Sequence, residues 1–77
     1  MKNVLIPLAP GFEEIETITV VDILRRSGAR VSTAGIVDGV IEGSRGVKLL
    51  ADESINNINS EKFDLMFLHG GNLEQII

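Results

Sequence analysis

The run from Lys2 to Leu8 is almost continuously apolar instead of alternating between apolar and polar residues. Such a run is typical of a parallel strand that is buried on both faces. A tight turn at Ala9-Pro10-Gly11 follows, and apolar periodicity from Phe12 to Ser27 predicts a helix that ends at Gly28. Arg30 to Ile36 predicts a second strand. The three elements form one βαβ unit with a right-handed crossover, so the sequence predicts an α/β fold.

Turn-forming residues divide the rest of the chain into shorter elements. Asp38-Gly39 predicts a β-hairpin between residues 35–37 and 40–42. The elements expected after it are, in chain order, a turn at 43–46, a short returning strand at 47–50, a short helix or irregular crossover at 52–60, a buried parallel strand at 63–68, a loop at 69–71 and the start of a helix at 72–77. These elements leave a sheet edge and one sheet face uncovered. We therefore expect residues 1–77 to be the N-terminal part of one larger α/β domain.

Composition excludes several functions. The chain has 77 residues, which fits one domain, and its hydrophobic content of 44% with only three Phe predicts an aliphatic core. It has no cysteine and one histidine, which excludes a conventional zinc site within the chain. The net charge is −4 and the basic residues are scattered, so we expect no nucleic-acid partner. No apolar run has the length of a signal peptide or a membrane span, so we expect a cytoplasmic protein without a membrane partner.

The glutamates that follow the first predicted strand are the first candidate functional residues. Ligands of open α/β sheets bind at the carboxyl ends of the strands, beside the loops that lead into helices. On a helical wheel, Glu16 falls within the apolar arc, Glu13 near its edge and Glu14 on the far side; the arc contains Phe12, Val20, Ile23 and Leu24. Burial would raise the pKa of Glu16 towards the range useful for proton sharing. Alternatively, Glu16 only favours the helix dipole or caps free N–H groups.

The second predicted loop of interest is His69-Gly70-Gly71. Two glycines after a buried strand allow backbone N–H groups to approach a ligand and stabilise an oxyanion, although a tight turn alone explains them too. His69 is a candidate base or ligand, or simply a packed side chain. A dinucleotide site is disfavoured because the first loop has a single glycine and its carboxylates repel phosphate.

One face of the predicted helix is a candidate subunit contact. Ile15 and Ile18 form an apolar centre that charged residues surround: Glu14, Asp22, Arg25 and Arg26. An apolar centre with a charged rim suits an interface. The alternative is two exposed isoleucines beside an i,i+4 pair of Asp22 and Arg26.

Taken together, four segments resemble the ThiJ/PfpI superfamily over essentially the whole chain, and within it the parkinsonism-associated protein deglycases and relatives annotated for thiazole monophosphate biosynthesis. The segments are residues 1–17, 21–28, 44–52 and 63–72, with the Gly-x-Glu-Glu-x-Glu stretch and a strand that ends in Gly-Gly as the specific features. The resemblance implies a flavodoxin-like three-layer sandwich with a mainly parallel sheet, incomplete in this chain. It also implies a homodimer, or a complementing C-terminal portion, and no cofactor.

The resemblance also implies a site. Glu16 matches the glutamate that shares the proton of a reactive cysteine, and Gly71 matches an oxyanion amide, beside Gly70 and Asn72. Arg26 and Arg45 match arginines near the dimer contact and the pocket rim. The implied activity is glyoxalase or deglycase chemistry on α-oxoaldehydes or their adducts, carried out by the whole protein. Alternatives are an oxidative-stress chaperone or dimerising scaffold, a peptidase or amidase of the same superfamily, and a product that only binds a partner. His69 stands where the family usually has proline, and the nucleophilic cysteine is absent from the 77 residues.

Overall fold

The computed structural model describes residues 2–67. Its strands and helices are, in chain order, β1 (Asn3–Leu8), α1 (Glu14–Arg26), β2 (Arg30–Gly35), β3 (Ile41–Glu42), β4 (Lys48–Leu49), β5 (Glu53–Ser54), the 3₁₀ turns η1 (Ile55–Asn57) and η2 (Ser60–Lys62), and β6 (Leu65–Met66). The predicted helix start at 72–77 lies outside the described residues. The predicted strand, helix and second strand are confirmed, with the helix two residues shorter at its N-terminus.

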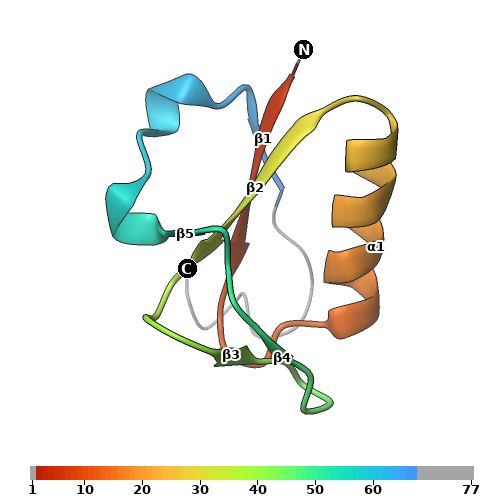
Figure 1. Cartoon of the computed structure of the whole chain (residues 1–77), viewed down its shortest axis with the longest axis vertical. Coiled ribbons are helices and arrows are strands. Elements are labelled where there is room, and N and C mark those ends of the chain that lie inside the picture. The colour runs from red at the N-terminus through yellow and green to blue at the C-terminus, as the bar shows by residue number, and fades with distance from the viewer. Residues whose placement is uncertain (1, 68–77) are drawn as a thin grey trace.

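The main sheet is parallel, with strand order β5-β2-β1-β6. β1 and β2 pair along their whole length, from Asn3 opposite Arg30 to Leu8 opposite Gly35. Figure 1 shows α1 on one side of this sheet and the two 3₁₀ turns on the other side. The predicted α/β class with a mainly parallel sheet is therefore confirmed.

The core is mainly aliphatic, as the composition predicts, with Phe12 as its largest buried side chain, and it lies mainly between α1 and the sheet. One cluster joins Val4, Ile6 and Val31 from the strands to the helix residues Val20, Val21 and Leu24. The other cluster lies at the carboxyl end of β1 and consists of Leu8, Phe12 and Ile41, with Leu49 and Ala51 packed against it. This second cluster joins the start of the helix segment to the β3–β4 region.

The hairpin lies one turn later in the chain than predicted. Residues 35–37 do not pair with 40–42; instead β3 pairs with β4, with Ile41 opposite Leu49 and Glu42 opposite Lys48. The reason is that the end of β2 is used in the parallel sheet, where Gly35 pairs with Ser54 of β5. The Asp38-Gly39 signal marks a bend between β2 and β3, and the hairpin turn forms at residues 43–47.

The segment from 52 to 67 packs more loosely than predicted. The predicted irregular crossover at 52–60 contains β5 and the 3₁₀ turn η1, and η2 follows at its end. The side chains of Ser54 and Asn59 accept hydrogen bonds from the amides of Asn56 and Glu61, the second residue of each turn. β6 is parallel to β1, as predicted, but Leu65 and Met66 are 55% and 49% exposed. The prediction of a buried strand is therefore wrong, because β6 is the outer strand of the described sheet. None of the helical segments in the described part has the length and apolarity that crossing a bilayer requires.

Candidate functional site

The loop between β1 and α1 makes a tight turn against the β3–β4 hairpin. Gly11 adopts a φ of 87°, a left-handed conformation that suits glycine. Its amide donates to the Glu42 carbonyl at 2.8 Å, and the Ser44 amide donates to the Phe12 carbonyl at 2.8 Å. These two hydrogen bonds fix the hairpin beside the first turn of α1, at the carboxyl end of β1. Figure 1 shows the hairpin at that end of the sheet, below the start of the helix.

Glu14, the first residue of α1, is the buried glutamate of this loop. Its exposure is 8%, and its carboxylate accepts three hydrogen bonds from the hairpin turn. Oε1 accepts from the Ser44 hydroxyl at 3.2 Å, and Oε2 accepts from the amides of Arg45 at 2.7 Å and Val47 at 3.2 Å. A carboxylate can be buried when hydrogen bonds replace those it loses to water, and this one meets that condition.

The electrostatics of Glu14 favour the ionised form. Burial raises its pKa, but hydrogen bonds from its own backbone, from the Val47 and Arg45 amides and from the Ser44 hydroxyl outweigh burial. The pKa therefore lies below the ordinary value of 4.5. The position of Glu14 at the helix N-terminus also suits a negative charge.

The structure contradicts the predicted burial of Glu16 and the predicted far-side position of Glu14. Glu16 is exposed, and the helix residues that face the sheet are Glu14, Thr17, Val20, Val21 and Leu24. The helical wheel gives the wrong buried face because two residues of its apolar arc do not belong to that face. Phe12 precedes the helix and therefore does not follow its periodicity, and Ile23 is 58% exposed. The proposed catalytic role of Glu16 is not tested by this exposure and stays a prediction.

Arg45 and Arg26 lie at opposite ends of α1. Arg45 is an exposed residue in the hairpin turn, and its amide is bound by Glu14 at the helix start. Arg26 is the last residue of the helix, 12 positions after Glu14. At 1.5 Å per residue, this spacing is roughly 18 Å along the helix axis. The structure therefore brings Arg45 to the candidate site and leaves Arg26 away from it.

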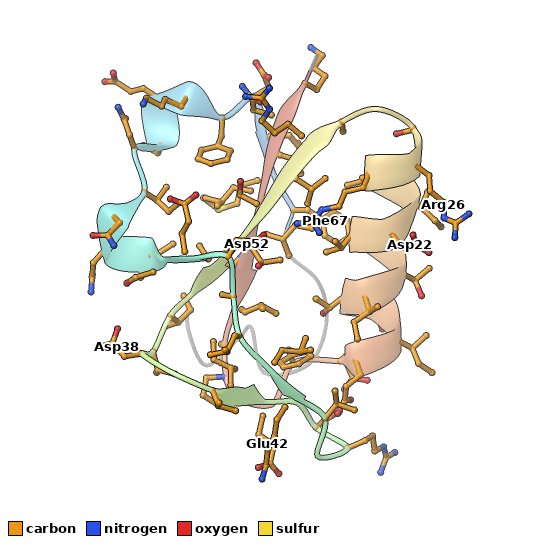
Figure 2. The ribbon with its side chains drawn as sticks, viewed as in Figure 1. Asp22, Arg26, Asp38, Glu42, Asp52 and Phe67 are labelled. Atoms are coloured by element: carbon orange, nitrogen blue, oxygen red, sulfur yellow. The ribbon has the colours of Figure 1, made fainter. Side chains whose placement is uncertain are left out.

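The predicted interface residues separate into two groups. Ile15 and Ile18 are 82% and 45% exposed, and Asp22 pairs with Arg26 at 2.9 Å. Figure 2 shows Asp22 and Arg26 on the side of α1 that faces away from the sheet. Arg25 and Ile18 both line one cleft beside α1.

The guanidinium of Arg25 reaches the edge of the sheet. It donates to the Val31 carbonyl at 2.9 Å and pairs with the Asp52 carboxylate at 2.9 Å. Asp52 also accepts hydrogen bonds from the amide and hydroxyl of Thr33. Glu14 is buried, which corrects its predicted place on the exposed rim around the two isoleucines. The Arg25 side chain stays 49% exposed while it bonds within the chain, so its place in the interface remains a prediction.

A cleft of about 170 Å³ lies beside Arg25, between α1 and the strand β4. Thr17 lines it and is 1% exposed, and its hydroxyl has no hydrogen-bond partner within residues 2–67. Sequence reasoning missed Thr17, Asp52 and the role of Glu14. Across the described range, no three histidine, cysteine or acidic side chains gather as metal ligands. The predicted site residues His69, Gly70, Gly71 and Asn72 lie outside the described residues.

Residues 2–76 match the model of the DJ-1/PfpI family. The chain therefore belongs to the DJ-1/PfpI family, which confirms the resemblance seen in the sequence.

Individual relatives cover nearly all of this chain but much less of their own length. Protein dj-1beta of Drosophila melanogaster is 45% identical over 71 residues, which are 91% of this chain and 38% of the relative. The glutathione-independent glyoxalase DJR-1.2 of Caenorhabditis elegans is 32% identical with the same two coverages. The solved structure of oxidised Toxoplasma gondii DJ-1 superposes with a TM-score of 0.87 at 39% identity, over 92% of this chain and 39% of that one. The chain thus spans less than two fifths of these relatives.

Proposed function

We propose that this chain is the N-terminal part of a single domain that acts as a cofactor-free glyoxalase or deglycase on α-oxoaldehydes or their adducts. Two findings support the proposal: membership of the DJ-1/PfpI family and 32% identity to a glutathione-independent glyoxalase. We place the protein in the cytoplasm, in keeping with its composition.

In the proposed mechanism, a cysteine thiolate adds to the aldehyde carbon of the substrate. The 77 residues contain no cysteine, so the thiolate comes from outside them. Glu16 shares the proton of that thiol and returns it to the reacting group. The Gly71 amide donates a hydrogen bond to the developing oxyanion, and Gly70 and Asn72 complete the same loop.

The position of Glu16 is the observation that carries the proposal. It lies in the first turn of α1, directly after the loop at the carboxyl end of β1, where α/β folds place their ligands. The Arg45 turn is fixed beside the same helix start and supplies a positive charge at the rim.

A second copy of the chain is the proposed partner. The outer face of α1 presents Ile15 and Ile18 next to the ion pair of Asp22 and Arg26. An apolar centre with a charged border is the pattern that recurs at subunit contacts. The self-complementary use of one helix face also suits the two-fold symmetry of most homodimers.

The test is turnover of methylglyoxal by the whole protein with Glu16→Leu, using Glu13→Leu as the matched control. We expect Glu16→Leu to lower kcat by roughly a hundredfold, in the range of general acid–base catalysis. Glu13→Leu should have little effect, because Glu13 makes no side-chain capping hydrogen bond. Unchanged turnover and cysteine reactivity in Glu16→Leu would remove the assigned role. Holdase activity without turnover would favour the chaperone, and cleavage of peptides would favour the peptidase.

A further inference from the structure

The Glu14 carboxylate is the main side-chain attachment between the start of α1 and the hairpin turn. The turn has two backbone hydrogen bonds of its own, from the Gly43 amide to the Val47 carbonyl and from the Gly46 amide to the Gly43 carbonyl. The amides of Arg45 and Val47 are bound by Glu14. The orientation of the turn relative to the helix therefore depends on this one side chain together with the Ser44–Phe12 and Gly11–Glu42 backbone bonds.

We propose that Glu14 is the positioning residue for Arg45. It holds the Arg45 amide at 2.7 Å, and so fixes the point from which the arginine side chain extends at the rim of the candidate site. The effect of Arg45 on substrate turnover rests on the proposed function, whereas the attachment of the turn by Glu14 does not. It makes Glu14, next but one to Glu16, a second glutamate on which the site depends, with a role separate from proton transfer.

Only a carboxylate serves all three donors without rearrangement. Both of its oxygens accept, and they face one hydroxyl and two backbone amides. A glutamine has one accepting oxygen, which can take the place of Oε2 opposite Arg45 and Val47. Its NH₂ group then faces the Ser44 hydroxyl, which can rotate and accept. Glu14→Gln therefore keeps most of the attachment and loses the charge, whereas Glu14→Ala loses every bond.

Gly43 shows how closely the carboxylate is packed. A Cβ atom at this buried position would lie 2.6 Å from both Cδ and Oε2 of Glu14. Gly43 does not have a positive φ, so a methyl group there is opposed by contact with Glu14 and not by backbone strain. Gly43→Ala therefore displaces the carboxylate without removing it, which provides a second and independent way to disturb the Arg45 turn.

The first experiment measures amide hydrogen exchange in the whole protein, at Arg45 and Val47, with the β2 amides as the internal reference. We expect Glu14→Ala to accelerate exchange at both turn amides by about tenfold or more, since a hydrogen bond to a charged group is lost at each. Glu14→Gln should give a smaller acceleration, and Glu13→Gln none. Unchanged exchange at Arg45 in Glu14→Ala overturns the proposal. Equal acceleration in β2 also overturns it, because the effect would then be a general loss of stability.

The second experiment is a double-mutant cycle of Glu14→Ala and Arg45→Ala, read as kcat/KM for methylglyoxal. If Glu14 acts through Arg45, both single variants lose activity and the double variant is no worse than Arg45→Ala within about twofold. Additive losses would contradict the positioning role. Absence of turnover in the wild type would refute the proposed function instead, and the exchange rates would still decide whether Glu14 holds the turn.

Discussion

Two carboxylates, Glu14 and Asp52, each attach a turn or loop to a neighbouring element, but they do so in different surroundings. Glu14 accepts three hydrogen bonds from the hairpin turn and is buried. Asp52 accepts hydrogen bonds from Thr33 and Arg25, and its side chain is 47% exposed. Figure 2 shows Asp52 in the segment between β4 and β5, beside β2. The two attachments have similar numbers of hydrogen bonds, but Asp52 pairs with a charged guanidinium at the surface and Glu14 binds neutral donors in a buried site.

The packing beneath the Glu14 attachment is also tighter than the packing beneath the Asp52 attachment. The hairpin that Glu14 holds lies on the cluster of Leu8, Phe12 and Ile41, which are at most 2% exposed. By contrast, none of residues 52–67 is fully buried. The carboxyl end of β1, where the candidate site lies, is therefore more tightly packed than the segment 52–67. The crossover after Asp52 depends more on hydrogen bonds at the surface.

Phe12 and Phe63 allow the packing difference to be measured with one substitution. Phe12→Ala should cost about 3–5 kcal/mol, the usual range for a buried phenylalanine, because it empties the centre of the cluster. Phe63→Ala, at a half-buried position, should cost less than about half of that. Chemical denaturation of the whole protein gives both values. Equal losses would show that the two regions are equally well packed.

Acid should release the Glu14 attachment. The pKa of Glu14 is lower in the folded chain than its ordinary value of 4.5, so the unfolded chain binds more protons in acid. The stabilisation is present above the ordinary pKa and is lost as the pH falls through the lowered one. Wild type should therefore lose stability over this acid range relative to Glu14→Gln, which has no proton to gain. A parallel pH dependence of the two proteins in unfolding titrations would contradict this assignment.

The elements were predictable from the sequence where a local pattern decided them. The continuously apolar run of β1 and the periodic run of α1 gave the βαβ unit and its parallel sheet. The hairpin was misplaced because two turn signals, at Asp38-Gly39 and at 43–46, compete, and the choice depends on β2 pairing with β5. The pairing of β2 with β5 joins residues that are far apart in the sequence, so no local sequence pattern predicts it.

The candidate site was predictable only as a location. The sequence predicts the loop after β1 and its three glutamates, but not which glutamate is buried, because Phe12 precedes the helix and does not follow its periodicity. A useful signal was present: Glu14 is the first helical residue, and the turn at 44–47 has amides that need acceptors. Glu14 and Arg45 are 31 residues apart in the sequence, so their hydrogen bond can be predicted only when the register of the β3–β4 hairpin is known.

Asp52→Asn tests the exposed attachment, and we expect it to lower the free energy of unfolding less than the substitutions at the buried end of β1. The substitution removes the charge that pairs with Arg25 and weakens the hydrogen bonds from Thr33, but both charged side chains are about half exposed, at 49% and 47%. Water screens such a pair, so we expect a loss of about 1 kcal/mol or less in the free energy of unfolding. Because the Asn side chain can still accept from the Thr33 amide, exchange at that amide should rise only slightly. Thr33→Val is the comparison variant: it leaves the ion pair but removes the hydroxyl that donates to the Asp52 carboxylate and accepts from the Asp52 amide. A larger loss in Asp52→Asn than in Glu14→Gln, measured at neutral pH, would reverse the order that burial predicts.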